Sequence, residues 1–340
     1  MKKLLVLLLL FSIMPPFLFA CGGETYPEGQ TGSENVSENE KSDSASDLPA
    51  INEVSEETRT GSFKAVVLGD SIARGYGLES PETMRFSSLM AETLGEVYES
   101  VDISNYGVDG RTGVELLEFL KNDPPEEIKD CDCVIISIGG NNILQMLDAA
   151  ETAFKALMEL DPKAVADYFK YSVATEGEGK DKFTYACDAI SSVFGAVNAV
   201  FESDTFNSLI TDAGKRLEEE IPQIIGEIRK LNPNAKIYFQ TVYNPYKGMN
   251  VALKAVTEQL KLDDYGERSV ASLNAPIEAL ADELGYEIVP VWTEFEESGK
   301  DLVNAGISLL PFNISVDPHP NWQGHELIAK IYCDIITEAK

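Results

Sequence analysis

Short apolar runs, with segments of helical periodicity between them, constrain the fold of this chain more than any other feature. The clearest run is Phe63 to Leu68, which Gly69 follows directly. Between the runs, apolar residues recur three or four positions apart, the spacing of a helix face. Buried strands that alternate with helices predict a parallel sheet with helices on both faces. The other runs lie at 101–106, 133–138, 236–240 and 287–291.

The first run leads into the sequence Gly69-Asp70-Ser71. A serine at a tight strand-to-helix turn presents its hydroxyl at the carboxyl edge of the sheet, where ligands bind in folds of this class. Its own backbone N–H points into the same space. Ser71 is therefore the candidate nucleophile, although a serine here could also act only as a helix N-cap. We expect Asp70 to be a structural hydrogen-bonding residue of the turn.

Two further turns carry groups that suit acyl transfer. Gly107 and Gly110 follow the second run, and glycine lets a backbone N–H approach a substrate oxygen closely. The third run ends in Gly139-Gly140-Asn141-Asn142. The side-chain amide of Asn141 could donate to a developing oxyanion, or it could simply satisfy loop backbone.

A serine nucleophile of this kind needs a histidine as its base, and the chain has only two. His319 stands between Pro318 and Pro320, which should hold it in a restricted loop before the terminal helix. His325 lies six residues further on. We expect it at the surface of that helix or partly buried, which leaves His319 as the candidate base.

Taken in order, these motifs resemble the four blocks of the GDSL/SGNH hydrolase family, and they span Phe63 to the C-terminus. The resemblance implies a flavodoxin-like three-layer α/β/α fold with a five-stranded parallel sheet. It implies that Ser71 is the nucleophile, His319 the base, and Ser71, Gly110 and Asn141 the oxyanion donors. The implied reaction is two-step hydrolysis of a carboxylic ester, without a metal or organic cofactor. A lysophospholipid or other acyl ester, or an O-acetylated carbohydrate, would be the substrate.

Two positions depart from the pattern of that family. Asn142 stands where the family usually has an aspartate, at a position of mostly local hydrogen bonding. The family places the third triad member three residues before the histidine, which is Val316 here. Asp317, two residues before His319, is therefore the candidate, and a backbone carbonyl is the alternative group that could orient the ring.

The N-terminus predicts export. Lys2 and Lys3 precede an apolar run to Ala20, so residues 1–20 are expected to be a secretory signal. The run is too short and too broken by proline for a comfortable membrane span. The sequence Leu18-Phe19-Ala20-Cys21 resembles a bacterial lipobox, which implies lipidation of Cys21 and anchoring outside the cytoplasm. Ordinary secretion with a chance cysteine is the alternative.

Residues 21–60 have few large apolar side chains, so we expect an acidic, disordered tether that leads to a hydrolase domain at 61–340. The chain has 27 basic and 57 acidic residues and a formal net charge of −30. This balance argues against nucleic-acid binding, which needs a basic surface. We expect a monomer that contacts the membrane only through its anchor.

The segment between the third and fourth runs is too long for one crossover helix. It contains three apolar stripes of helical spacing, at 147–158, 190–201 and 217–228, and a polar loop tip at 176–182. We predict a helical insertion at about 145–212 that overhangs the site. It would serve as a lid or acyl-binding cap, or only as a packing elaboration.

Four cysteines follow Cys21. Cys131 and Cys133 are two apart in the third run and should face the same side of the sheet, while Cys187 and Cys333 are isolated. The spacing is poor for a metal site, and four cysteines do not make a disulfide scaffold, although export permits a bridge. Small buried thiols are the expected role.

Two other classes of protein compete with an esterase. A solute-binding lipoprotein would need two lobes of similar size, whereas this chain has one series of strands with one large insertion. A non-catalytic surface protein that retains the fold is the second rival, because the short spacing from Asp317 to His319 leaves the triad geometry open.

Overall fold

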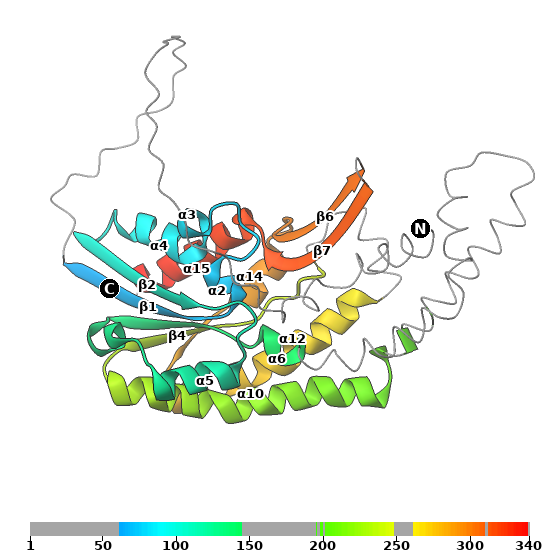
Figure 1. Ribbon diagram of the computed structural model, residues 1–340, viewed down its shortest axis with the longest axis horizontal. Helices are drawn as coiled ribbons and strands as arrows, with labels where there is room; N and C mark the ends of the chain where they lie inside the picture. Colours follow the sequence, from blue (N-terminus) through cyan, green and yellow to red (C-terminus); the bar gives the residue numbers. More distant parts are fainter. Residues whose placement is uncertain are drawn as a thin grey trace, which may run out of the picture.

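The computed structural model describes residues 61–144, 201–247, 261–309 and 312–338, together with 195, 198 and 199. Its centre is a five-stranded sheet in the order β2-β1-β3-β4-β5, with every neighbouring pair parallel (Figure 1). This flavodoxin-like order confirms the predicted fold. The strands are β1 (Ser62–Gly69), β2 (Ser100–Gly107), β3 (Cys133–Ser137), β4 (Lys236–Gln240) and β5 (Glu287–Val289).

Helices cover both faces of the sheet (Figure 1). One layer contains α4 and α15, and the opposite layer contains α5, α10 and α12. The described helices are α2 (Ser71–Arg74), α3 (Pro81–Met84), α4 (Phe86–Leu94), α5 (Gly113–Asn122), α6 (Gly140–Leu144), α10 (Asp204–Leu231), α12 (Leu262–Ala279), α13 (Ala281–Leu284), α14 (Val291–Glu297) and α15 (Trp322–Glu338), with a 3₁₀ turn at Glu126–Asp130.

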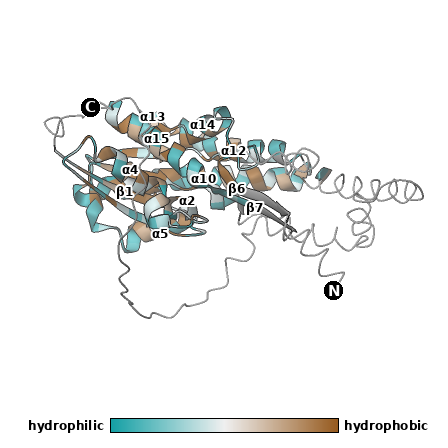
Figure 2. Cartoon of the chain, turned by 90° about the horizontal axis from the view of Figure 1, so that it is seen from above, coloured by the Kyte–Doolittle hydropathy of each residue, from teal (hydrophilic) through white to brown (hydrophobic). Residues whose placement is uncertain are grey.

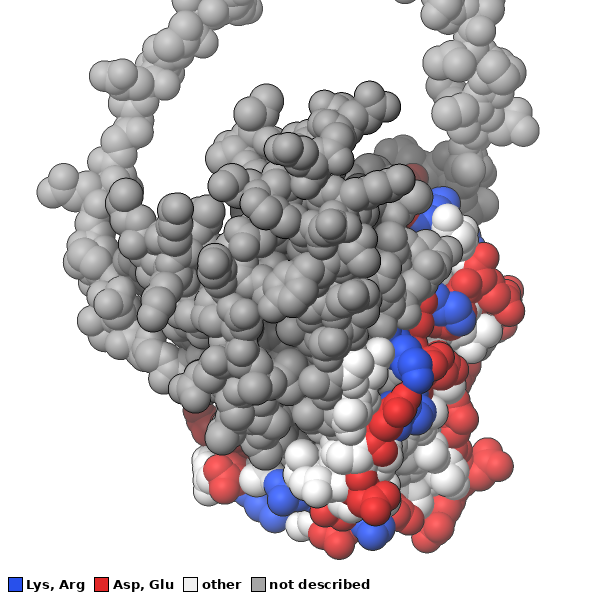
Figure 3. Space-filling model, turned by 90° about the vertical axis from the view of Figure 1, so that its right-hand side faces the viewer, with Lys and Arg blue, Asp and Glu red and all other residues white. Residues whose placement is uncertain are grey.

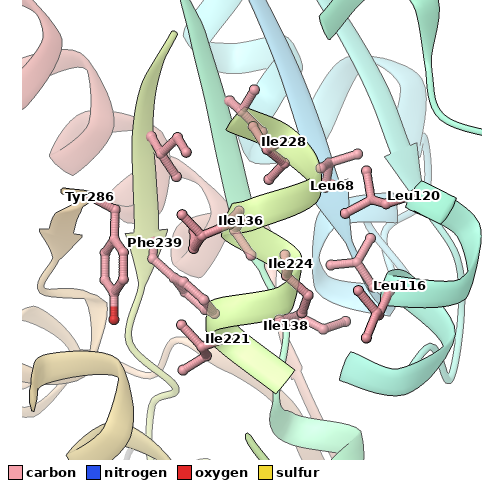
Figure 4. Close-up of a cluster of buried hydrophobic side chains, with 14 of the residues drawn as sticks. Leu68, Leu116, Leu120, Ile136, Ile138, Ile221, Ile224, Ile228, Phe239 and Tyr286 are labelled. Atoms are coloured by element: carbon pink, nitrogen blue, oxygen red, sulfur yellow. The ribbon is translucent and has the colours of Figure 1, made fainter. Parts of the chain in front are cut away.

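The helices carry hydrophobic and hydrophilic residues in alternating patches, as expected for helices that bury one face against a sheet (Figure 2). Figure 4 shows one of the two resulting cores, in which Ile221, Ile224 and Ile228 of α10 lie over the sheet beside Leu116 of α5 and Ile136 of β3. All five side chains have no exposed surface. Burial of each such side chain contributes about 1.5–3 kcal/mol, so α10 is held firmly against the strands.

The helix α10 extends over 28 residues and includes Pro222 without ending there. Its N-terminus is capped by the side chain of Ser203, which accepts from the N–H of Phe206. The helix therefore begins inside the segment 145–212 that the sequence assigned to an insertion. The remainder of that segment, the signal 1–20 and the tether 21–60 lie outside the described residues.

An antiparallel hairpin that the sequence did not predict precedes α15. Its strands are β6 (Val303–Leu309) and β7 (Phe312–Pro320), and Val303 pairs with Pro320. The hairpin rises beside the carboxyl edge of the sheet (Figure 1). The prediction of a loop around His319 was wrong, because this residue lies at the end of β7, held in position by the pairing of Pro320.

The cysteines are buried as predicted, but their orientation differs. Cys131, Cys133 and Cys333 are free, buried thiols, and Cys187 lies outside the described residues. Cys131 packs in the core with α10, whereas Cys133 packs in the core with α4 and α15. The two do not share a side, because β3 begins only at Cys133, while Cys131 ends the 3₁₀ turn and a bend at Asp132 separates them.

Acidic and basic side chains are interspersed over the described part of the face shown in Figure 3. Within the described ranges, no helix is long and apolar enough to cross a membrane. The same ranges contain no cluster of three His, Cys, Asp or Glu side chains suited to holding a metal ion.

Candidate active site

A tight turn between β1 and α2 places Ser71. The N–H of Asp70 donates to the carbonyl of Ser137 on β3 at 3.1 Å, so the turn is tied to the neighbouring strand. Gly69 is required there, because a Cβ would lie 2.5 Å from the same carbonyl oxygen. The Asp70 carboxylate caps α2 by accepting from the N–H of Ile72 at 2.9 Å. Ser71 is therefore the first residue of α2, not its N-cap.

Ser71, His319 and Asp317 form one hydrogen-bonded chain. The Nε2 of His319 lies 2.8 Å from the Oγ of Ser71. Its Nδ1 lies 2.5 Å from the Oδ1 of Asp317, which also accepts from the backbone N–H of His319 at 3.1 Å. A carboxylate at Nδ1 holds the proton there, so Nε2 is left as the acceptor that faces the serine hydroxyl. The two-residue spacing therefore does bring the Asp317 carboxylate to the ring.

Neighbouring side chains hold the segment that carries His319. The hydroxyl of Tyr243, after β4, donates to the carbonyl of Pro318 at 2.6 Å. The ring of Tyr76 lies 4.5 Å from the His319 ring, measured between centroids. Gly77 adopts φ +84°, and a Cβ there would lie 2.5 Å from Nδ2 of Asn304 and 3.1 Å from Oδ2 of Asp317. The Tyr76–Gly77 turn thus packs directly against the histidine and its acid.

Asn141 lies beside Ser71, whereas Gly110 lies further out. The Nδ2 of Asn141 donates to the carbonyl of Arg111 at 3.0 Å and approaches Oδ2 of Asp70 at 3.4 Å. Gly110 has φ +74° in an exposed turn, immediately before Arg111. The side chain of Asn141 thus reaches the segment that carries Gly110. Of the predicted site residues, Ser71, Asn141 and His319 line one cavity, whereas Gly110 and Asp317 are not part of its wall.

The carboxyl group of Asp70 is buried beside these residues. Burial raises its pKa to about 7, against the lowering effects of the Ile72 N–H and of His319. Burial also lowers the pKa of Arg111, which Glu115 and Asp70 act to raise. Asp70 is therefore the structural residue that the sequence predicted, but its charge is poised to change near neutral pH.

The cavity at Ser71 has a volume of about 100 Å³. Beyond the three site residues its wall is mostly apolar, and it is built by the loop after β4 and by one face of α12. The lining residues from these two elements include Val242, Tyr243, Pro245, Tyr246, Tyr265, Val270 and Leu273.

His325 differs from the prediction of a surface or partly buried residue. It is fully buried in α15, and its Nδ1 accepts from the N–H of Phe86 at 3.3 Å. Burial, aided by the charge of His319, lowers its pKa to about 3. The ring stacks on Phe86 with centroids 6.2 Å apart, so the helix face that carries His325 packs on α4 rather than facing solvent.

Two residues near the site, Tyr243 and Glu220, were not predicted from the sequence. Tyr243 belongs to no motif that would mark it in the sequence, and it lines the cavity together with Pro245. Glu220 was hidden in the apolar stripe of α10, where it is buried and accepts from Nδ2 of Asn142 at 2.9 Å. Only its acidic character within an apolar stripe could have marked it.

Residues 67–327 match the GDSL-like Lipase/Acylhydrolase family. An uncharacterized protein of Bacillus subtilis, YpmR, is 23% identical over 278 residues, which are 81% of this chain and 82% of that protein. The phospholipase A1 of Streptomyces albidoflavus has a similar structure, with TM-score 0.48, 16% identity, and coverage of 81% of this chain and 98% of that one. The extracellular lipase of Streptomyces rimosus is also similar, with TM-score 0.48 and 17% identity, and the match covers 82% of this chain and 100% of that lipase. Since the family match extends over most of the sequence, the chain belongs to the GDSL-like Lipase/Acylhydrolase family and is a carboxylic ester hydrolase.

Proposed function

We propose that this protein hydrolyses carboxylic esters by two-step acyl transfer through Ser71. The observation that carries the proposal is the chain of contacts from Ser71 Oγ to His319 Nε2 at 2.8 Å and from His319 Nδ1 to Asp317 at 2.5 Å. His319 takes the serine proton as Oγ attacks the ester carbonyl, and then gives it to the leaving alcohol. A water molecule repeats the attack on the acyl-enzyme and releases the acid.

The oxyanion would be bound by the backbone N–H of Ser71 and the side chain of Asn141, with the N–H of Gly110 as third donor. The contact of Asn141 with Asp70, at 3.4 Å, is longer than that with Arg111, at 3.0 Å. A substrate oxygen could therefore replace Asp70 as an acceptor while Arg111 continues to orient the amide. Donors already placed before the charge develops stabilise the transition state most effectively.

The apolar wall of the cavity favours an acyl ester with a hydrocarbon chain, such as a lysophospholipid, over an O-acetyl ester. Val242 is well placed to set the chain length. Its N–H donates to Oδ1 of Asn274 at 2.8 Å and its carbonyl accepts from Nδ2 of the same residue at 2.9 Å, so its backbone is fixed at the cavity wall. A larger side chain at 242 would fill the cavity without moving the loop.

The purified protein should hydrolyse p-nitrophenyl octanoate with a higher kcat/KM than p-nitrophenyl acetate. Val242→Phe should reverse this preference, because the added ring occupies the space of the chain. Glu267→Gln, at an exposed position of α12, is the control and should leave both rates unchanged. A wild type that hydrolyses neither ester would support a non-catalytic surface or solute-binding protein. A preference for acetate would favour O-acetylated carbohydrates instead.

We further propose that Cys21 carries a lipid anchor, that residues 1–20 are removed, and that the domain is held as a monomer on the extracytoplasmic face of the membrane. The sequence Phe19-Ala20-Cys21 supports the anchor, and the two lysines followed by an apolar run support the removed signal. Cys21→Ser should shift the protein from the membrane fraction to the soluble fraction. If wild type and variant fractionate alike, the proposed anchor is absent.

A further inference from the structure

Helix α10 contributes a buried carboxylate to the loops of the site. Glu220 is only 6% exposed, whereas its neighbour Glu219 is exposed. Burial raises the pKa of Glu220, and the amide of Asn142 acts against this by donating to it. A buried carboxylate is costly unless it is hydrogen-bonded, so this contact is important for the local structure.

Asn142 joins Glu220 to the start of α5. Its Nδ2 donates to Oε2 of Glu220 at 2.9 Å, and its Oδ1 accepts from the N–H of Gly113 at 3.1 Å. Gly113 lies so close to the carboxylate that a Cβ there would overlap Oε2. Three elements, α5, α6 and α10, therefore meet at one buried hydrogen-bonded pair.

The same segment is held by the preceding residue. Asn141 donates to the carbonyl of Arg111, two residues before Gly113, at 3.0 Å. Two adjacent asparagines thus hold both ends of the segment 111–113, which continues directly from Gly110. If Glu220 or Asn142 moved, the spacing between Gly110 and the amide of Asn141 would change.

We propose that Glu220 is a positioning residue of this esterase, which acts through Asn142 to fix the segment 110–113 relative to the Asn141 amide that binds the oxyanion. This inference rests on the proposed function, since it assigns a residue to the same reaction. It also explains the asparagine at 142. The Asn142 amide accepts from the Gly113 N–H and donates to the Glu220 carboxylate at once, whereas an ionised aspartate at this position could only accept.

An aspartate at position 142 would instead face the Glu220 carboxylate. Two carboxylates at such a distance cannot both ionise freely, so the pKa of one is strongly raised. The other charges that act on Glu220 come from its own helix, where Arg216 lowers its pKa and Glu219 raises it. From α5 and α6 it meets the Gly113 backbone and the Asn142 amide, while the carboxylate of Glu115 on α5 is bonded to Thr112.

The test is the pH profile of kcat and KM for Asn142→Asp, Glu220→Gln and the double variant. At low pH one carboxyl of Asn142→Asp is protonated and can donate to the other, so the segment holds. As pH rises, both ionise and repel, and kcat should fall by about tenfold to a hundredfold with little change in KM. In the double variant the new amide at position 220 can donate to the new carboxylate at position 142, so kcat should recover at all pH values. Glu220→Gln alone should stay near wild type, since its amide oxygen still accepts from Asn142.

Glu219→Gln is the matched control and should follow the wild-type profile, including any change due to Asp70. Thermal melting of each variant at each pH gives the folded fraction, by which kcat is corrected. The proposal is overturned if the corrected kcat of Asn142→Asp follows the same pH profile as the control. It is also overturned if adding Glu220→Gln to Asn142→Asp fails to restore kcat at high pH. If the wild type showed no esterase activity and was not labelled by a fluorophosphonate, the proposed function would be overturned, and this inference with it.

Discussion

Ser71→Ala should abolish ester hydrolysis and should also prevent covalent labelling by a fluorophosphonate. Removal of the nucleophile of a serine hydrolase lowers kcat by roughly 10⁶, because the remaining groups can only position a water. Fold stability should change little. The Ser71 side chain contributes no cap to α2, since Asp70 has that role. Rates against p-nitrophenyl octanoate and gel fluorescence after labelling measure the two effects separately.

Ser208→Ala provides the control, because Ser208 is an exposed serine of α10 whose hydroxyl donates to the carbonyl of Asp204 in its own helix. It should retain full rate and full labelling. If Ser71→Ala hydrolysed the ester at the wild-type rate, the activity would belong to another residue or to a contaminant.

His319→Gln should lower kcat by a similar factor, about 10⁶, because Ser71 then has no base and the leaving group no acid. His325→Gln should instead leave kcat unchanged and lower the free energy of unfolding. His325 accepts from the N–H of Phe86 in a fully buried position, and a poorly replaced buried bond costs about 1–3 kcal/mol. Measurements of kcat and of thermal melting on the two variants should therefore give opposite patterns.

The pH dependence of stability tests the burial of His325. Burial holds the folded pKa of His325 at about 3, below its usual value of 6.5. Its folded form thus favours the neutral ring, so this contribution to stability is present above pH 6.5 and is lost as pH falls toward 3. His325→Gln should weaken this loss of stability in acid. Equal acid sensitivity of wild type and variant would contradict the assignment.

Much of the framework could be predicted because local sequence determines it. The run Ala65 to Leu68 is apolar on both faces, so it had to be a central strand, and a turn that follows such a strand opens at the carboxyl edge. Ser71 and Asn141 both follow such strands, and their meeting at one cavity is a consequence of the strand order.

The rest depended on contacts between distant segments. The spacing of Asp317 and His319 could not show whether the carboxylate turns toward the ring, since that depends on the pairing of Val303 with Pro320 in the hairpin. The burial of His325 depends on α4, more than two hundred residues earlier in the chain. Glu220 acquires its role only because α10 crosses the starts of α5 and α6, and no periodicity within α10 indicates this.

The bond from Ser71 to His319 closes a loop of 248 residues. When the first strand and its serine emerge during synthesis, the histidine and its aspartate have not yet been made. The nucleophile can acquire its base only after all five strands have been synthesised and the hairpin has docked, and contacts so distant in sequence form late. The growing polypeptide is therefore expected to be chemically inert toward nearby esters, and the acquisition of activity would report completion of folding.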